Sequence, residues 1–333
     1  MDIELFESFF NDLPKYRIEQ ARKTVFQEYV SGWDKAIVFS KDLRASLAEN
    51  LSIKVKGEVK TESSNSKKAI IKVSDKHSIE TVLIKNKDGR NTICLSSQIG
   101  CPMGCLFCAT GKMGFVRDLT TEEMLDQVLF WGRYIKENEL GEINNLVFMG
   151  MGEPLLNYNN LLKAIKIIND PKYFGIGARR ISISTIGIPS YIGRLAAEKI
   201  QFNVAWSLHA TDDGKREKIM PAASQYRINE VLYAFQDYIK KTHRKVMVEY
   251  LMLKDFNDSV EEAEKLAKLL KGGLFMVNLL TYNETGKFKP SSEKTMNDFA
   301  TKLKHHKIEV TIRKSAGGNI KAACGQLATE EEK

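Results

Sequence analysis

The chain has 333 residues, of which 43% are hydrophobic, and a formal net charge of +8. This length and composition predict a folded protein with one catalytic domain and a smaller accessory one. No apolar run approaches the roughly 20 residues that a membrane helix needs, and the first residues are acidic where a signal peptide is basic, which predicts a cytoplasmic protein without a membrane partner. The positive charge favours a polyanionic partner, above all nucleic acid, although a merely soluble basic protein has the same charge.

The N-terminal third divides into two parts. Residues 1–50 have apolar positions at helical spacing in 16–29 and 43–51, which predicts a small helical accessory domain. Residues 51–91 change to short β-like runs such as 79–84, joined by a polar, Lys-rich stretch, and form a linker or β extension. We expect the catalytic domain over 92–315 and a separate C-terminal tail over 316–333.

From residue 92 onward, predicted strands alternate with predicted helices. Thr120 and Glu123 match a capping box before a helix over 121–137, and Ser259 with Glu262 matches a second before a helix that ends near Lys271. Strands are expected at 92–97, 145–149, 180–184, 202–207, 246–253, 275–280 and 308–313.

This alternation predicts an α/β fold with parallel strands and helical crossovers, either a barrel or an open doubly wound sheet. The count gives six βα units and a closing strand, two units fewer than a full eight-fold barrel. A partial, open-sided (β/α)6 barrel fits this count better, and its open side would admit a large substrate.

Four of the five cysteines are gathered in a short stretch of sequence. Cys101, Cys105 and Cys108 form a CxxxCxxC pattern just after the first barrel strand, Cys94 lies within that strand, and Cys324 lies near the C-terminus. An odd number of cysteines in a reducing compartment indicates metal or redox chemistry rather than a disulfide framework. Three thiolates at these spacings can hold one face of an iron-sulfur cluster and leave one iron open.

Two other readings of the cysteines stay open. A structural zinc site would use Cys94 or Cys324 as its fourth ligand. A redox pair of Cys105 and Cys108 would leave Cys101 without a role.

Several longer motifs add to the cysteine pattern. They are CLSSQIGCPMGCLFCATGKMGF at 94–115, FMGMGEPLLN at 148–157, SISTIG at 182–187, WSLHA at 206–210 and AACGQLA at 322–328. With these motifs the chain resembles the radical S-adenosylmethionine (SAM) superfamily. Within it, residues 13–328 resemble the bacterial methyltransferases that act on carbon 2 of an adenine in 23S rRNA and on a tRNA adenine.

The resemblance implies a radical SAM partial barrel, a 4Fe-4S cluster on Cys101, Cys105 and Cys108, and bound SAM. Its implied SAM contacts follow the predicted strands, where barrel enzymes place their chemistry. They are Gly152, Glu153, Ser184, Ser207, Leu208, His209 and Asn283. Taken alone, Gly152 and Glu153 would more often form a plain turn, and His209 a structural histidine. The loop after Asn283 also lacks the proline that many relatives have there.

The resemblance further implies that Cys324 takes a methyl group from one SAM and becomes S-methylcysteine. A radical made from a second SAM would remove hydrogen from this group, which would then add to the adenine ring. Cys94 would release the covalent adduct through a transient disulfide with Cys324, and Glu80 would accept a proton. Without the resemblance, Glu80 reads as a solvated carboxylate and Cys324 as a buried small residue.

The implied partners are 23S rRNA, tRNA and an electron donor such as flavodoxin or ferredoxin, with the protein itself a monomer. The helices of 1–50 and a Lys-rich region are candidate RNA surfaces, although scattered lysines usually form a solvated face. The lysines of this region are Lys54, Lys56, Lys60, Lys67 and Lys68. One alternative is methylation at carbon 8 of the same rRNA adenine, against which Pro154 is a small discriminator. Another is a catalytically silent iron-sulfur protein that binds RNA or assists ribosome assembly, which would need neither Cys94 nor Cys324. A third is a radical enzyme acting on a small metabolite.

Overall fold

The computed structural model describes residues 1–73, 76–313 and 317–328. The predicted boundary between residues 315 and 316 lies outside these ranges. Among the described residues, no helix combines the length and apolar character needed to cross a membrane.

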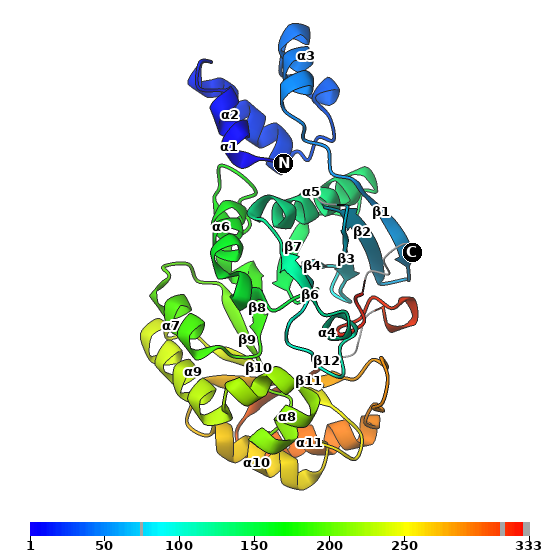
Figure 1. Cartoon of the computed structure of the whole chain (residues 1–333), viewed down its shortest axis with the longest axis vertical. Coiled ribbons are helices and arrows are strands. Elements are labelled where there is room, and N and C mark those ends of the chain that lie inside the picture. Colours follow the sequence, from blue (N-terminus) through cyan, green and yellow to red (C-terminus); the bar gives the residue numbers. More distant parts are fainter. Residues whose placement is uncertain (74–75, 314–316, 329–333) are drawn as a thin grey trace.

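The first fifty residues fold into a helical module at one end of the molecule (Figure 1). Its core is aromatic, with Phe6 packed edge-on against Phe26 and near-parallel to Trp33. Phe26 also contacts the rings of Tyr173 and Phe174, which lie in the loop after α6, so the module is joined to the barrel by aromatic packing. The module contains α1 (Ile3–Phe9), α2 (Lys15–Arg22) continued by a π turn (Lys23–Gln27), a 3-10 turn (Trp33–Lys35) and α3 (Lys41–Asn50).

A ten-stranded sheet forms the centre of the protein, in the order β1-β2-β3-β4-β7-β8-β9-β10-β11-β12. The first four strands pair antiparallel, and β1 pairs only with β2, with a bulge between Val59 and Thr61. All six pairings from β4 to β12 are parallel. The antiparallel strands are β1 (Gly57–Glu62), β2 (Ser66–Lys72) and β3 (Ser78–Lys85). The parallel strands are β4 (Asn91–Cys94), β7 (Ile143–Phe148), β8 (Ile181–Thr185), β9 (Asn203–Ser207), β10 (Val246–Met252), β11 (Phe275–Thr281) and β12 (Glu309–Arg313).

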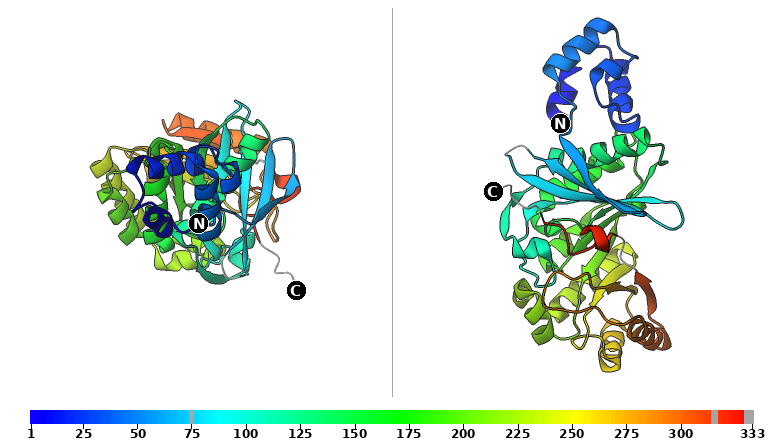
Figure 2. Two further views of the ribbon diagram at one scale, coloured as in Figure 1. Left: turned by 90° about the horizontal axis from the view of Figure 1, so that it is seen from above. Right: turned by 90° about the vertical axis from the view of Figure 1, so that its right-hand side faces the viewer.

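Helices cover the outer face of the parallel strands, as both figures show (Figures 1 and 2). They are α5 (Thr121–Glu137), α6 (Tyr158–Asn169), α7 (Pro189–Ala197), α8 (Asp213–Ile219), α9 (Ile228–Thr242), α10 (Val260–Leu270) and α11 (Glu293–His305). A two-stranded hairpin of β5 (Gln98–Gly100) and β6 (Phe115–Asp118) encloses the short helix α4 (Ala109–Lys112). Among the described strands, β12 pairs with β11 alone, so the sheet is not closed, and the predicted partial barrel is confirmed.

The sequence patterns located the strands and the best-capped helix well. All seven predicted barrel strands are present, although the first ends at Cys94 rather than at residue 97. The helix predicted over 121–137 has these bounds, with both hydrogen bonds of the Thr120 capping box formed.

The second predicted box is only half right. Ser259 caps α10, but the Glu262 carboxylate turns to accept from Thr211, Lys215 and Lys265 instead of bonding back to the cap. A buried carboxylate gains more from two ammonium groups than from one backbone N–H.

Candidate active site

The three cysteines of the CxxxCxxC pattern lie on the loop between β5 and α4, at the carboxyl end of β4. Glycines set the shape of this loop: Gly100 and Gly104 have positive φ angles of 71° and 62°. A Cβ on Gly100 would lie 1.9 Å from the Gly114 carbonyl oxygen, so no other residue fits there. Two backbone bonds close the loop, from Cys101 N–H to Gly114 and from Cys108 N–H to Cys105.

The thiols of this loop lie close enough to influence one another electrostatically. Burial, with smaller effects from nearby Glu153 and Cys108, raises the pKa of Cys101 to about 12. Burial and the other two thiols raise the pKa of Cys105 well above its ordinary value. A metal would have to displace the protons of these thiols, which is the usual effect of a soft metal on cysteine.

Gly152 and Glu153 follow β7 and reach the same region. Gly152 has a φ of 102°, and a Cβ there would lie 2.6 Å from Cβ of Gln98. The Glu153 carboxylate accepts hydrogen bonds from the backbone N–H groups of Leu155 and Ile186, at 3.1 and 2.9 Å. Burial raises its pKa to about 7, so a cationic ligand would find a carboxylate that gains from being paired.

Two serines lie side by side at the carboxyl ends of the next strands. The hydroxyl oxygens of Ser184 on β8 and Ser207 on β9 are 3.1 Å apart, and both residues are partly accessible. This pair can hydrogen-bond to hydroxyl or carboxylate groups of a ligand.

Leu208 and His209 are buried and bonded to neighbouring strands. The Leu208 N–H donates to the Glu249 carbonyl, and Nδ1 of His209 accepts from the Leu251 N–H at 3.1 Å. Burial, with Arg216 nearby, lowers the His209 pKa to about 3, so the ring is neutral and carries its proton on Nε2. Its ring meets Phe107 of the cysteine loop edge-on, with the centroids 5.1 Å apart.

Arg216 was not singled out from the sequence, yet it is fully buried beside the cysteine loop. Its guanidinium donates to the carbonyls of Ile186, Ser207, Leu208 and Tyr226. Burial lowers its pKa to about 10, while Cys105 raises it, so this cation faces the thiols. No pattern in the charged helix α8 reveals which of its residues turns inward.

A polar row crosses the barrel interior at the level of Ser207. Glu249 on β10 pairs in register with Ser207 and with Asn278 on β11, and Asn278 with Thr311 on β12. Asn278 donates to the Glu249 carboxylate at 2.8 Å and accepts from the Thr311 hydroxyl at 2.6 Å. The sequence carried a usable signal, because Glu249 and Asn278 each interrupt an apolar strand run.

The C-terminal tail places Cys324 beside this row. Glu249 and Arg313 both act on its thiol electrostatically, and so does Cys108. Cys324 has exposed surface, yet burial of its thiol among the neighbouring groups raises its pKa. Asn283 donates from Nδ2 to the Cys324 carbonyl at 3.2 Å, so in this structure it contacts the tail.

Cys94 and Glu80 complete the group. Burial raises the pKa of Cys94, and so does the nearby thiol of Cys324. Glu80 on β3 is only 3% exposed, which corrects the reading of it as a solvated carboxylate. It pairs with Lys68 at 2.7 Å and accepts from the Ala328 N–H of the tail at 2.9 Å.

The residues present fit an iron-sulfur cluster. Among the described residues, no three Cys, His, Asp or Glu side chains converge on a single metal ion. A four-iron cluster requires a different arrangement, because each thiolate binds its own iron and the ligands are separated by the width of the cluster. Three thiols on one loop, with the Arg216 cation beside Cys105, match this donor set and its negative charge.

A search against protein families matches residues 95–270 to the radical SAM superfamily, and this range includes the cysteine loop, Glu153 and the paired serines. The chain is also 42% identical to the probable dual-specificity RNA methyltransferase RlmN of Thermotoga neapolitana, over 95% of this chain and 92% of that protein. The chain belongs to the RlmN family of radical SAM proteins.

Two further comparisons agree over nearly the whole length. The RlmN of Nautilia profundicola is 41% identical over 98% of this chain and 96% of its own. The crystal structure of a radical SAM methyltransferase from Sphaerobacter thermophilus superposes with a TM-score of 0.91 at 38% identity, over 98% of this chain and 96% of that one. These relatives therefore share both the barrel fold and the N-terminal helical module with this chain.

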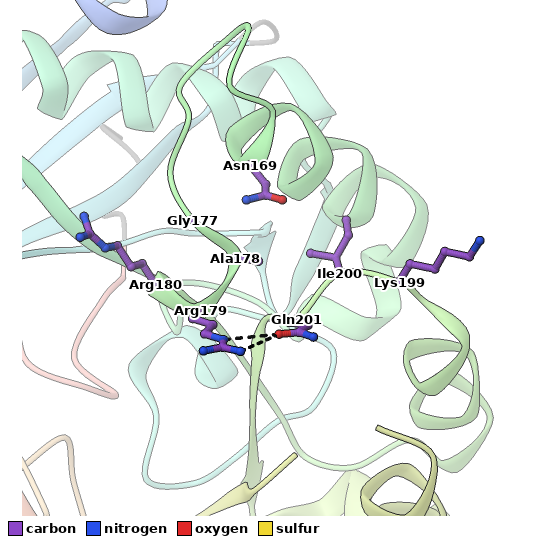
Figure 3. Close-up of a pocket in the computed structure, with 8 residues that line it drawn as sticks. All are labelled: Asn169, Gly177, Ala178, Arg179, Arg180, Lys199, Ile200 and Gln201. Carbon is purple, nitrogen blue, oxygen red and sulfur yellow. Dashed lines mark hydrogen bonds between the residues drawn. The ribbon is translucent and has the colours of Figure 1, made fainter. Parts of the chain in front are cut away.

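A separate hollow of this radical SAM protein lies at the amino ends of β8 and β9 (Figure 3). It has a volume of about 480 Å³ and is lined by residues just before β8 and β9, including Arg179, Lys199 and Gln201. The Arg179 side chain already donates a hydrogen bond to Gln201. Because the lining residues precede β8 and β9 in the chain, the hollow lies at the end of these strands opposite to the cysteines. It has no part in the site described above.

Proposed function

We propose that this protein is a radical SAM methyltransferase that methylates carbon 2 of an adenine in 23S rRNA and of a tRNA adenine. The observation that supports this most is the tail thiol. Cys324 lies within electrostatic reach of both Cys94 and the cluster loop, although it is more than 200 residues away from them in sequence. An iron-sulfur protein without catalysis would need neither Cys324 nor Cys94.

The target atom explains the need for a radical route. Carbon 2 of adenine lies between two ring nitrogens and is electron-poor, so it does not attack the methyl group of SAM as a nucleophile. A 4Fe-4S cluster held by Cys101, Cys105 and Cys108 would supply the electron that turns SAM into a radical source. The chain itself supplies orientation, exclusion of water and the acceptors of methyl group and proton.

Each of three residues has one task in this scheme. The Cys324 thiol accepts a methyl group and delivers its carbon to the adenine, forming a covalent adduct. Cys94 then attacks the Cys324 sulfur as a thiolate and breaks its bond to carbon, which leaves a transient disulfide. The released carbon keeps the bonding electrons and takes up a proton to become the methyl group. Glu80 accepts the proton that leaves carbon 2, and its contact with the tail at Ala328 keeps it near Cys324.

The remaining groups would hold SAM and the electron donor. Glu153 suits the SAM ammonium, with Gly152 allowing close backbone approach, and the pair of Ser184 and Ser207 suits hydroxyl or carboxylate groups. Leu208, His209 and Asn283 complete the proposed pocket. A small reductant such as flavodoxin or ferredoxin would supply electrons to a cytoplasmic monomer.

RNA would approach the open side of the barrel with its target adenine extruded from the helix. The lysines proposed for RNA contact differ in what they can offer. Lys60, Lys67 and Lys68 are paired with Glu58, Glu62 and Glu80. Lys54, Lys56 and Lys72 instead line a hollow of about 700 Å³ where the accessory module meets the barrel, and Lys163 in the same hollow is paired with Glu4. Lys54, Lys56 and Lys72 are therefore the better candidates for phosphate contact.

The test is direct identification of the product. The cluster is reconstituted without oxygen, and the protein is incubated with SAM, a reductant and unmethylated 23S rRNA fragment or tRNA. Nucleosides are then compared with standards by mass spectrometry. We expect 2-methyladenosine from the wild type and none from Cys324→Ala.

Each other outcome has a definite meaning. 8-Methyladenosine would assign the chain to carbon 8 chemistry, against the indication from Pro154. Absence of either product from both RNAs, with cluster and SAM bound, would refute the RNA assignment and make small metabolites the substrates to test.

A further inference from the structure

The helix α4, which follows the cysteine loop, is bonded directly to the tail that carries Cys324. The Thr110 hydroxyl donates to the Leu327 carbonyl at 2.5 Å, and Thr110 is only 2% exposed. The Ala109 N–H donates to the Gly325 carbonyl at 2.6 Å. These two bonds bracket the tail immediately after Cys324.

The backbone approach at this junction is close. Gly325 has a φ of 82°, and a Cβ there would lie 3.1 Å from the Phe107 carbonyl oxygen. On the other side of α4, a Cβ on Gly111 would lie 2.8 Å from the backbone nitrogen of Cys105. Tail, helix and cysteine loop are therefore packed at backbone distance, so a displacement of one is transmitted to the next.

A third segment is tied to the same junction. The Thr285 hydroxyl donates to the Phe107 carbonyl at 2.9 Å, and Asn283, two residues earlier, donates to the Cys324 carbonyl. The cysteine loop and the tail thus share partners as well as touching each other. The tail is also held by the Ala328 N–H, which donates to the Glu80 carboxylate, and by the Thr61 hydroxyl, which donates to the Ile320 carbonyl.

We propose that Thr110 is a positioning residue that couples the cysteine loop to the tail, so that filling the loop with its cluster fixes Cys324 in place. Without iron the three thiols place no restraint on the loop, and a tail bonded to the loop shares its motion. Once three cysteines are fixed by iron, α4 becomes a rigid support for Leu327 and Gly325. This role rests on the proposed function only in naming the cluster and in giving Cys324 a reaction to perform.

The experiment measures how fast iodoacetamide alkylates Cys324, read by peptide mass spectrometry in cluster-loaded and cluster-free protein. No RNA or turnover is involved. In loaded protein, Thr110→Val should raise the rate about fivefold, the effect of losing one hydrogen bond of about 1 kcal/mol. In cluster-free protein the same change should raise it less than twofold, because the support is already loose.

Three variants separate positioning from general damage. Thr110→Ser keeps the hydroxyl and should restore the wild-type rate. Thr121→Val removes another buried hydroxyl, which donates to the Asn160 carbonyl away from the tail, and should leave Cys324 unchanged. Gly325→Ala should raise the rate without altering α4, which keeps the test decisive where Thr110→Val takes up iron poorly.

Equal rates for wild type, Thr110→Val and Gly325→Ala in loaded protein would overturn the coupling. So would an equal rise in Thr110→Ser or Thr121→Val, since the hydroxyl at this position would then have no special role. If the coupling is found but the wild type methylates no RNA, only the proposed function fails.

Discussion

The two sides of the site are held in different ways. Glu153, the paired serines and His209 follow or end barrel strands, and Arg216 reaches them from α8; most of these residues are buried and bonded to nearby backbone groups. Cys324 lies on a tail with little regular structure beyond one 3-10 turn, fixed by a handful of hydrogen bonds. The rigid residues around Glu153 suit the binding of SAM in one pose. The proposed chemistry instead requires Cys324 to approach a methyl donor, an adenine and Cys94 in turn, which suits a loosely held tail.

The largest expected effect tests the rigid side. Replacing Arg216 with Leu leaves four backbone carbonyls without their buried donor, so the free energy of unfolding should fall by roughly 3–5 kcal/mol. Urea unfolding of the cluster-free protein measures this change. Arg90→Leu, on an exposed turn, is the matched control and should leave the midpoint where it was. A loss no larger than the control's would show that the strand ends do not depend on this cation.

Gly152→Ala comes next. The new Cβ would clash with Gln98 at a φ of 102°, and the combined strain should cost about 3 kcal/mol in urea unfolding. Gly104→Ala is a useful contrast, because its φ is 62° and no atom lies within 4 Å of the new Cβ. It should cost about 1 kcal/mol. Equal losses of unfolding free energy in the two variants would mean that the turn after β7 rearranges readily to accept the new Cβ.

The pH dependence of stability offers a smaller, separate test. His209 has a pKa of about 3 in the folded protein and an ordinary value of 6.5. Above pH 6.5 both states are neutral; below it only the unfolded chain binds the proton, so stability is lost as the pH falls. Between pH 6.5 and 5 the loss from this residue should reach about 2 kcal/mol.

The difference between wild type and His209→Asn isolates this contribution in urea unfolding at each pH. His305→Asn, on the exposed end of α11, should keep the wild-type slope. Parallel curves for wild type and His209→Asn would contradict the neutral, buried assignment.

The smallest effect concerns the tail. Asn283→Ala removes one half-exposed bond to Cys324 and should change the unfolding free energy by less than about 1 kcal/mol. Hydrogen exchange of the peptide around Cys324 should nevertheless become faster. If the same variant also binds SAM more weakly, Asn283 contacts SAM as predicted, in addition to its contact with the tail.

The sequence predicted the barrel because its strands are apolar runs bounded by good caps. Glu123 at the third position of a helix after Thr120 is a local signal, and the structure obeys it. Glu262 has the same spacing from Ser259 but pairs with Lys215, which is distant in sequence. Partners that are brought together only by folding cannot be recognised from the local sequence.

The site was predicted from motifs rather than from physics alone. Glu80 looked like a surface carboxylate, and its burial depends on Lys68 and on a tail residue about 250 positions away. Arg216 gave no signal, whereas Glu249 interrupts an apolar strand and could have been found. The link from Thr110 to Leu327 could not be foreseen, because neither residue type nor spacing indicates it.

The outer edge of the sheet has a consequence for the protein in a crowded solution. Among the described strands, β1 pairs with β2 alone, so its outer side is a sheet edge, which is the geometry that allows strands of different molecules to join. Its side chains include Glu58, Lys60 and Glu62, and its bulge interrupts the regular ladder. The charged side chains and the bulge of β1 should therefore oppose edge-to-edge association. Replacing Glu58, Lys60 and Glu62 with uncharged residues should lower the protein concentration at which the chain precipitates.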